Sequence, residues 1–247
     1  MRMGCVVWWV LLVCSCHFLQ EASMQSPNTL HNQEEALFDQ WQLRHPHFVS
    51  DGALHGPSYL AARYKLVFLL KEVSEEKGEN WDLRELALTN SPAQTWNNVA
   101  RWTFGILHLP EKIPWKLLPD QCDLSFRSEW LRNIVAVNIN KTGGGSSSNP
   151  ANLTEFLRSN RNELRQQVQL YGPNFTICCG TWEYLTDLLE PSELGKWDMT
   201  SNGLWYSKCG MLGIAIKYYH PQVRYPNNFL YTMLIDGVKE LLIGNGS

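Results

Sequence analysis

The sequence lacks several features that would point directly to one class of function. Its 247 residues contain no Cys-x-x-Cys pair, so a zinc site or a thiol-redox site is not expected. No internal repeat is present, and no glycine-rich loop closes in Gly-Lys-Ser/Thr, which excludes the phosphate loop of nucleotide hydrolases. The net charge of −3 argues against a generally basic protein that coats nucleic acids, although a local basic groove would not show in that sum.

Cysteine is sparse in the body of the chain. Three of the seven cysteines fall within the first sixteen residues, which leaves Cys122, Cys178, Cys179 and Cys209. Their spacing requires no disulfide, and it leaves disulfides open for an exported protein. Cys178 and Cys179 lie inside an apolar run, where neighbouring side chains point to opposite faces of a strand and a free cysteine packs as a small hydrophobe.

The N-terminus supports two readings. Residues 1–23 hold an apolar run that is short for a membrane span and shaped like the core of a signal peptide, with a lipoprotein-like Cys16, so the protein would be secreted or lipid-anchored. Alternatively, translation starts at Met24 and the protein is cytoplasmic. In either case we expect an N-terminal extension over 24–59 and one α/β domain over 60–247, since 247 residues with 44% hydrophobic content suit a single core.

Short apolar runs alternate with helical patterns along the rest of the chain. Strands are predicted at residues 65–73, 134–137 and 174–181, with a hairpin or strand pair over 204–221. Helices are predicted over 33–48, for about four turns after Ser91-Pro92, as one long helix after Asn149-Pro150, and over 226–243. This alternation predicts an α/β three-layer sandwich with a mostly parallel central sheet of about four strands.

Polar residues follow the predicted strands where each strand ends. Lys71, Glu72 and Ser74 lie at the end of the first strand, Asn138 ends the central apolar run, and His220 lies at the end of the last strand pair. Open α/β sheets bind ligands at the carboxyl ends of their strands, so Lys71, Glu72, Asn138 and His220 are expected to converge in one cleft. The simpler alternatives are solvated loop charges, a flexible crossover loop at 143–145, and a histidine satisfied by the backbone.

Three of these segments together resemble the uracil-DNA glycosylase-like superfamily, over roughly residues 60–243. They are Asn138 in AVNINK, the strand-then-Gly-Thr step in YGPNFTICCGT, and His220-Pro221-Gln222 in YYHPQVR. The first motif departs from the family pattern. Lys71-Glu72-Val73-Ser74 stands where the family has a glycine-rich turn with Asp or Asn, which leaves the activation of water to Glu72 or to no residue.

The resemblance implies hydrolysis of the N-glycosidic bond of uracil or a related base in DNA, single-stranded or with the base flipped out. It implies that Asn138 reads the edge of the base, that Trp96 or Trp81 stacks on it, and that His220 donates to a carbonyl as the base departs. We expect contacts to DNA or phosphate from Lys71, Lys141, Gly144, Ser146 and Arg224. The protein is expected to be a monomer without metal or cofactor. The alternatives are a catalytically inactive nucleic-acid or nucleotide binder and an exported protein of unknown role on the same fold.

Overall fold

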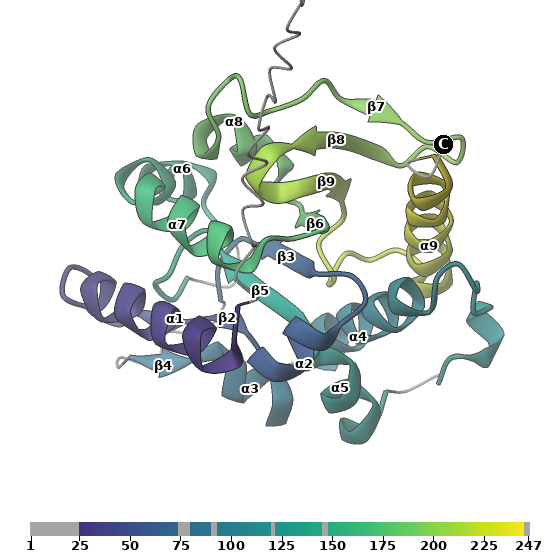
Figure 1. The fold of residues 1–247 in the computed structure, drawn as a ribbon, viewed down its shortest axis with the longest axis horizontal. Helices are drawn as coiled ribbons and strands as arrows, with labels where there is room; N and C mark the ends of the chain where they lie inside the picture. Colours follow the sequence, from purple (N-terminus) through teal and green to yellow (C-terminus); the bar gives the residue numbers. More distant parts are fainter. Residues whose placement is uncertain (1–24, 74–79, 90–92, 120–121, 145–147, 245–247) are drawn as a thin grey trace, which may run out of the picture.

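A seven-stranded sheet forms the centre of the molecule (Figure 1). A computed structural model describes residues 25–73, 80–89, 93–119, 122–144 and 148–244. The strand order across the sheet is β2-β5-β3-β6-β9-β8-β7. These strands are β2 (Gly52–Ala53), β3 (Leu66–Leu70), β5 (Ile134–Asn138), β6 (Phe175–Cys179), β7 (Asp198–Met199), β8 (Trp205–Cys209) and β9 (Gly213–Tyr218). A separate parallel pair joins β1 (Val49–Ser50) to β4 (Trp81–Asp82).

The sheet is mixed. β5, β3, β6 and β9 lie parallel to one another, whereas β2 pairs antiparallel with β5, β8 with β9, and β7 with β8. The predicted α/β class is therefore confirmed, but in the described residues the sheet has seven strands instead of about four. The sequence pattern missed β2 and β7 because each has only two residues, too few to show a period.

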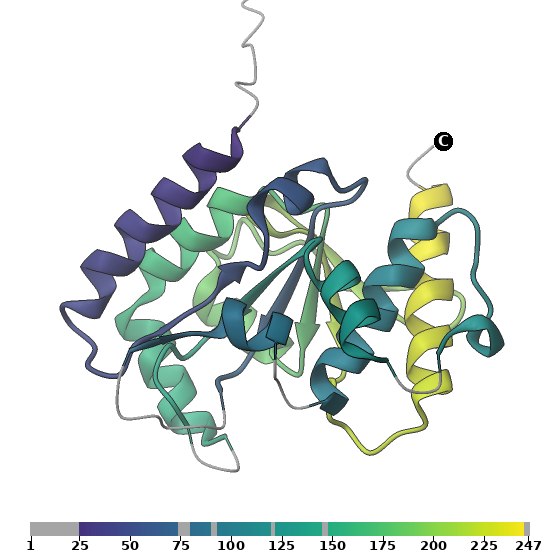
Figure 2. The same cartoon turned by 90° about the horizontal axis from the view of Figure 1, so that it is seen from below.

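Helices cover both faces of the sheet, as Figure 2 shows. α3 (Leu83–Thr89), α4 (Ala93–His108), α5 (Leu124–Leu131) and α9 (Asn227–Gly244) cover one face, and α1 (Pro27–Gln42), α2 (Gly56–Ala61), α6 (Pro150–Ser159), α7 (Arg161–Tyr171) and α8 (Leu185–Leu188) cover the other. Single turns of 3₁₀ helix lie at Trp115–Leu117, Trp182–Tyr184 and Gly210–Leu212. The side chains of β3 alternate between the two hydrophobic layers, which explains why all five of its residues are apolar.

The same alternation places the adjacent cysteines. Cys178 packs in the layer under α6 and α7, and Cys179 packs in the layer under α4 and α9, as predicted for neighbours on a strand. Cys122, Cys178, Cys179 and Cys209 are all buried and free. Burial raises the pKa of the Cys178 thiol, so it packs as a neutral hydrophobe.

One predicted helix proves to be two. α6 ends at Ser159 and α7 begins at Arg161, with Asn160 between them at φ −123° and ψ 23°. The Asn160 side chain is buried, where its oxygen accepts from the indole nitrogen of Trp41 at 2.8 Å and its nitrogen donates to the Phe156 carbonyl at 2.9 Å. The break therefore provides a polar anchor for α1, which no pattern within residues 150–168 could indicate.

The described part of the segment predicted as an extension, residues 25–59, packs against the same sheet. α1 buries Leu30, Phe38 and Trp41 against the sheet, and β2 extends the sheet beside β5. Within the described residues, no helix is long and apolar enough to cross a membrane. The predicted leader, residues 1–23, and the predicted helix cap at Ser91-Pro92 lie outside the described residues.

Candidate functional site

A small cavity lies at the carboxyl ends of the parallel strands. The chain leaves β3 for β5 on one side of the sheet and leaves β6 for β9 on the other, so these strand ends form the crevice in which α/β sheets bind ligands. The cavity measures about 100 Å³. Its lining residues are Leu70, Glu72, Val73, Trp81, Leu83, Leu86, Thr95, Trp96, Asn138, His220 and Gln222. The structure thus brings Glu72, Trp96, Asn138 and His220 together around one space.

Asn138, which lines this cavity, carries an unsatisfied hydrogen-bond donor. Its side chain is 1% exposed, and its Nδ2 has no hydrogen-bond partner among the described residues. Its backbone N–H donates to Asp51 Oδ2 at 2.7 Å, which fixes the end of β5. A buried amide donor without a partner costs about 1–3 kcal/mol, so a group that accepts from it would recover that free energy.

His220 contributes a second donor. The backbone N–H of Gln222 donates to His220 Nδ1 at 3.2 Å, so the neutral ring carries its proton on Nε2. Burial, and then the positive charge of Lys71, lower the pKa of His220 below its usual value. At neutral pH the imidazole is therefore uncharged and presents one N–H.

Glu72 lies at the wall between two hollows. It lines the cavity and also a larger hollow of about 490 Å³ beside Asn140, Thr142 and α6. Asn140 Nδ2 donates to Glu72 Oε2 at 2.9 Å and so holds the carboxylate in place. A Cβ on Gly144 would lie 2.5 Å from Glu72 Cδ, so any other residue there would displace the carboxylate from this position.

Gly144 takes part in the packing of Glu72. Its N–H donates to the Val73 carbonyl at 2.8 Å, so this amide, which was predicted to contact a phosphate, already has a partner within the chain. Lys71 does not line the cavity, but its charge acts on His220, and a Cβ on Gly180 would meet Lys71 Cε at 3.5 Å. Arg224 is exposed in the loop that follows His220. Ser74 and Ser146 lie outside the described residues.

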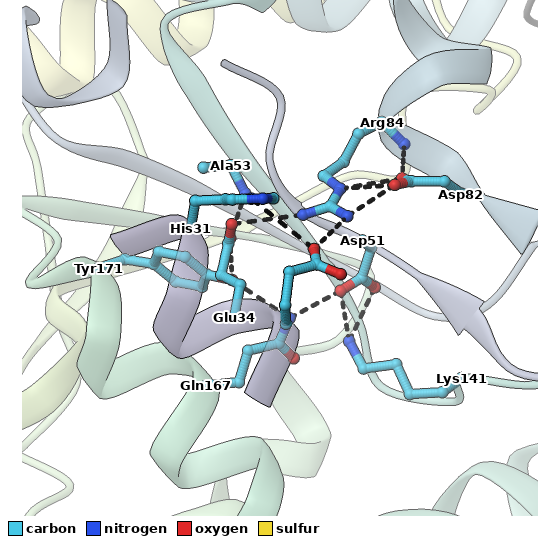
Figure 3. A network of polar contacts seen from close by, with 10 residues as sticks. His31, Glu34, Asp51, Ala53, Asp82, Arg84, Lys141, Gln167 and Tyr171 are labelled. Atoms are coloured by element: carbon cyan, nitrogen blue, oxygen red, sulfur yellow. Dashed lines mark hydrogen bonds and ion pairs between the residues drawn. The ribbon is translucent and has the colours of Figure 1, made fainter. Parts of the chain in front are cut away.

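Lys141 is buried in an ion pair. Its side chain is 0% exposed, and its Nζ binds Asp51 Oδ1 at 2.6 Å and Oδ2 at 2.8 Å (Figure 3). The ammonium lies 5.4 Å from the ring centre of Trp41. The sequence predicted a phosphate contact here, whereas Lys141 follows the strand end and turns inward, where the Asp51 carboxylate from a distant segment binds its ammonium.

This ion pair belongs to a buried polar network that joins α1, β2 and α7 (Figure 3). Gln167 Nε2 donates to Asp51 Oδ1 at 2.7 Å, and the Tyr171 hydroxyl donates to Glu34 Oε1 at 2.8 Å. Glu34 Oε1 also accepts from the Ala53 N–H at 2.8 Å, and its Oε2 lies 3.3 Å from Arg84. Since Asp51 also accepts a hydrogen bond from the Asn138 backbone N–H, the network fixes the position of Asn138 in the wall of the cavity.

Glu34 makes the network sensitive to pH. Burial raises the pKa of Glu34 to about 7, against the opposing effects of the Ala53 N–H and the Arg84 charge. Between pH of about 4.5 and 7 the folded protein keeps a proton that the unfolded chain has released. The free energy of unfolding should therefore fall as the pH rises through this interval, by up to about 3 kcal/mol from this group.

Replacement of Glu34 by glutamine tests this expectation, because the amide keeps the shape but cannot titrate. Urea unfolding from pH 5 to 8 should show a flatter dependence on pH for Glu34→Gln than for the wild type. Glu35→Gln is the matched control, since Glu35 also pairs with Arg84 but lies at the surface. Parallel pH profiles for the wild type and Glu34→Gln would contradict the assignment.

Three arginines of α6 and α7 are held in ion pairs. Arg158, Arg161 and Arg165 pair with Asp187, Glu190 and Glu193. In the described residues, no cluster of three or more His, Cys, Asp or Glu side chains could hold a metal ion.

Comparison with known proteins gives no relative. No protein-family model, no curated protein and no solved structure matches this chain.

The sequence analysis did not identify Thr95, Asn140 or Asp51 as part of the site or its support. Only Asn140 carried a local signal, because it lies two residues beyond Asn138 in the same loop.

Proposed function

We propose that the cavity binds a pyrimidine nucleobase and that the protein hydrolyses the N-glycosidic bond of that base in DNA, with a fold like that of the uracil-DNA glycosylase superfamily. The observation that carries the proposal is the buried, unpaired Nδ2 of Asn138 in the wall of a cavity of about 100 Å³. The four adjacent parallel strands, with the site at their carboxyl ends, support the fold assignment.

The size of the cavity favours one ring. Ordinary ligand pockets measure roughly 300–1,000 Å³, whereas an apolar cavity of about 150 Å³ takes up benzene. The walls contain Leu70, Val73 and Leu86, with Trp81 and Trp96 as aromatic surfaces. A planar six-membered ring matches this space and these walls better than a whole nucleotide does.

The polar groups favour a ring that carries carbonyl oxygens. Asn138 Nδ2 and the Nε2–H of neutral His220 are both donors, so they match acceptors on the edge of a base. A ring without an acceptor at these positions would leave the Asn138 donor buried and unpaired. Uracil and thymine carry such carbonyl groups.

We assign the chemical step to Glu72, which lines the cavity. A water molecule oriented by its carboxylate attacks the anomeric carbon of the sugar, and the bond from that carbon to the base breaks. The bonding electron pair leaves with the base, where the donors of Asn138 and His220 stabilise the charge on a carbonyl oxygen. Glu72 takes the proton from the water, so the sugar gains a hydroxyl.

Binding of free uracil tests the proposal. Calorimetry should show that Asn138→Ala weakens binding roughly 5- to 150-fold, the equivalent of the 1–3 kcal/mol of an unpaired buried polar group. Asn138→Asp should also lower the affinity for uracil, because a carboxylate offers no donor to the carbonyl of the base. Asn28→Ala on the exposed side of α1 is the control. Equal uracil affinity in Asn138→Ala and the wild type would refute the role of the amide.

A non-catalytic base binder is the second candidate. It is favoured by the Asn140–Glu72 hydrogen bond of 2.9 Å, which occupies one carboxylate oxygen, and by the departure of the first motif from the family pattern. Release of uracil from a single-stranded oligonucleotide separates the two. Binding of uracil without its release from the oligonucleotide would identify the protein as a non-catalytic base binder.

A further inference from the structure

The loop that carries His220 and the first turn of α9 together present three exposed aromatic rings. Tyr219 is 36% exposed, and Tyr225 and Phe229 are each 49% exposed. Of the nine large hydrophobic side chains that are exposed in the described residues, three lie within residues 219–229, the segment that also supplies His220 and Gln222 to the cavity. Exposed aromatic clusters on soluble proteins are common binding surfaces.

The rings form a continuous row, which we call the aromatic row. The ring centres of Tyr219 and Tyr225 are 5.2 Å apart, and those of Tyr225 and Phe229 are 6.3 Å apart. At its inner end, Tyr219 contacts Tyr218 at 5.6 Å, and Tyr218 contacts Trp102 of α4 at 5.1 Å. The row therefore runs from the hydrophobic core to the surface.

Hydrogen bonds from Asn98 of α4 hold the backbone of the loop in place. The buried Asn98 Nδ2 donates to the Pro221 carbonyl at 2.7 Å and to Asn227 Oδ1 at 3.1 Å. The Val223 N–H donates to the His220 carbonyl at 2.9 Å. A rigid surface loses little conformational entropy on binding, so the rings are preorganised for a partner.

The loop also matches the charge of a nucleic acid. Residues 219–229 contain Arg224 and no Asp or Glu, and His220 and Gln222 of the same loop line the cavity. Aromatic rings beside a cationic side chain are the features with which proteins bind single strands, because every base offers a face for stacking. A duplex hides those faces.

We propose that the aromatic row binds the unpaired bases of a single-stranded polynucleotide next to the base that enters the cavity. Tyr225 and Phe229 stack on bases, and Arg224 lies near the backbone phosphates. Because this inference rests on the proposed function for the base in the cavity, its test uses a readout that is independent of free uracil.

Fluorescence anisotropy with a labelled oligothymidylate provides that readout. Tyr225→Ala and Phe229→Ala should each weaken binding roughly 5- to 150-fold, the equivalent of 1–3 kcal/mol for one stacked base. Tyr225→Phe keeps the ring and should bind as the wild type does. Leu43→Ala removes an apolar side chain that is 88% exposed at the end of α1 and is the control. A blunt duplex should bind more weakly than the single strand, and labelled oligouridylate shows whether RNA is accepted.

The outcomes separate the two proposals. Unchanged oligothymidylate affinity in Tyr225→Ala and Phe229→Ala, or no binding by the wild type, overturns the aromatic row as a binding surface even if uracil binds in the cavity. Loss of affinity in both alanine variants, with retention in Tyr225→Phe, supports it even if Asn138→Ala leaves uracil binding unchanged. Equal loss in Leu43→Ala or equal affinity for duplex would show non-specific association and overturn it.

Discussion

Replacement of Lys141 by methionine is expected to lower the free energy of unfolding by about 3–5 kcal/mol. The variant removes the ammonium that binds both oxygens of Asp51 and leaves that carboxylate buried at 0% exposure without its counter-ion. The remaining donors to Asp51, from Gln167 and the Asn138 backbone, do not carry a full positive charge. Urea unfolding monitored by tryptophan fluorescence measures the change.

A double variant identifies the cause of this loss. Asp51→Asn combined with Lys141→Met removes both charges and keeps a side chain that can accept from Asn138, so it should recover part of the stability lost by Lys141→Met. Arg158→Met is the matched control, because its ion pair with Asp187 is at the surface and contributes little. A loss in Arg158→Met as large as in Lys141→Met would show that the burial of the pair is not the reason.

The positions of the parallel strands could be predicted because the sheet is buried on both faces. β3 and β5 carry five buried residues each, which appear in the sequence as short apolar runs ended by a polar residue. The polar residues that end or follow such runs then indicate one edge of the sheet. Glu72, Asn138 and His220 reach the same cavity for this reason.

The direction of a side chain beyond a strand end could not be predicted. Lys141 turns inward to Asp51, which lies 90 residues earlier in the chain. The Gly144 N–H donates to the Val73 carbonyl. Neither partner leaves a local signal, since a sequence pattern reports spacing within one element only. Arg84 illustrates the same limit. Its guanidinium binds the nearby Asp82 at 2.6 Å, but it also reaches Glu34 and Glu35 of α1, some fifty residues earlier in the chain.

Substitution of Glu72 by glutamine is expected to reduce the release of uracil from single-stranded DNA by about 100- to 10,000-fold, the usual contribution of a general base. The glutamine oxygen can still accept from Asn140 and the side chain keeps its volume beside Gly144, so affinity for uracil and the free energy of unfolding should stay near the wild-type values. Glu129→Gln on the exposed side of α5 should leave release unchanged.

Release is measured under single-turnover conditions, so that product dissociation does not limit the rate. Equal release by Glu72→Gln and the wild type would remove Glu72 from the chemical step. A loss of uracil affinity that matches the loss of rate would instead make Glu72 a binding residue, because only an interaction confined to the transition state lowers the rate alone.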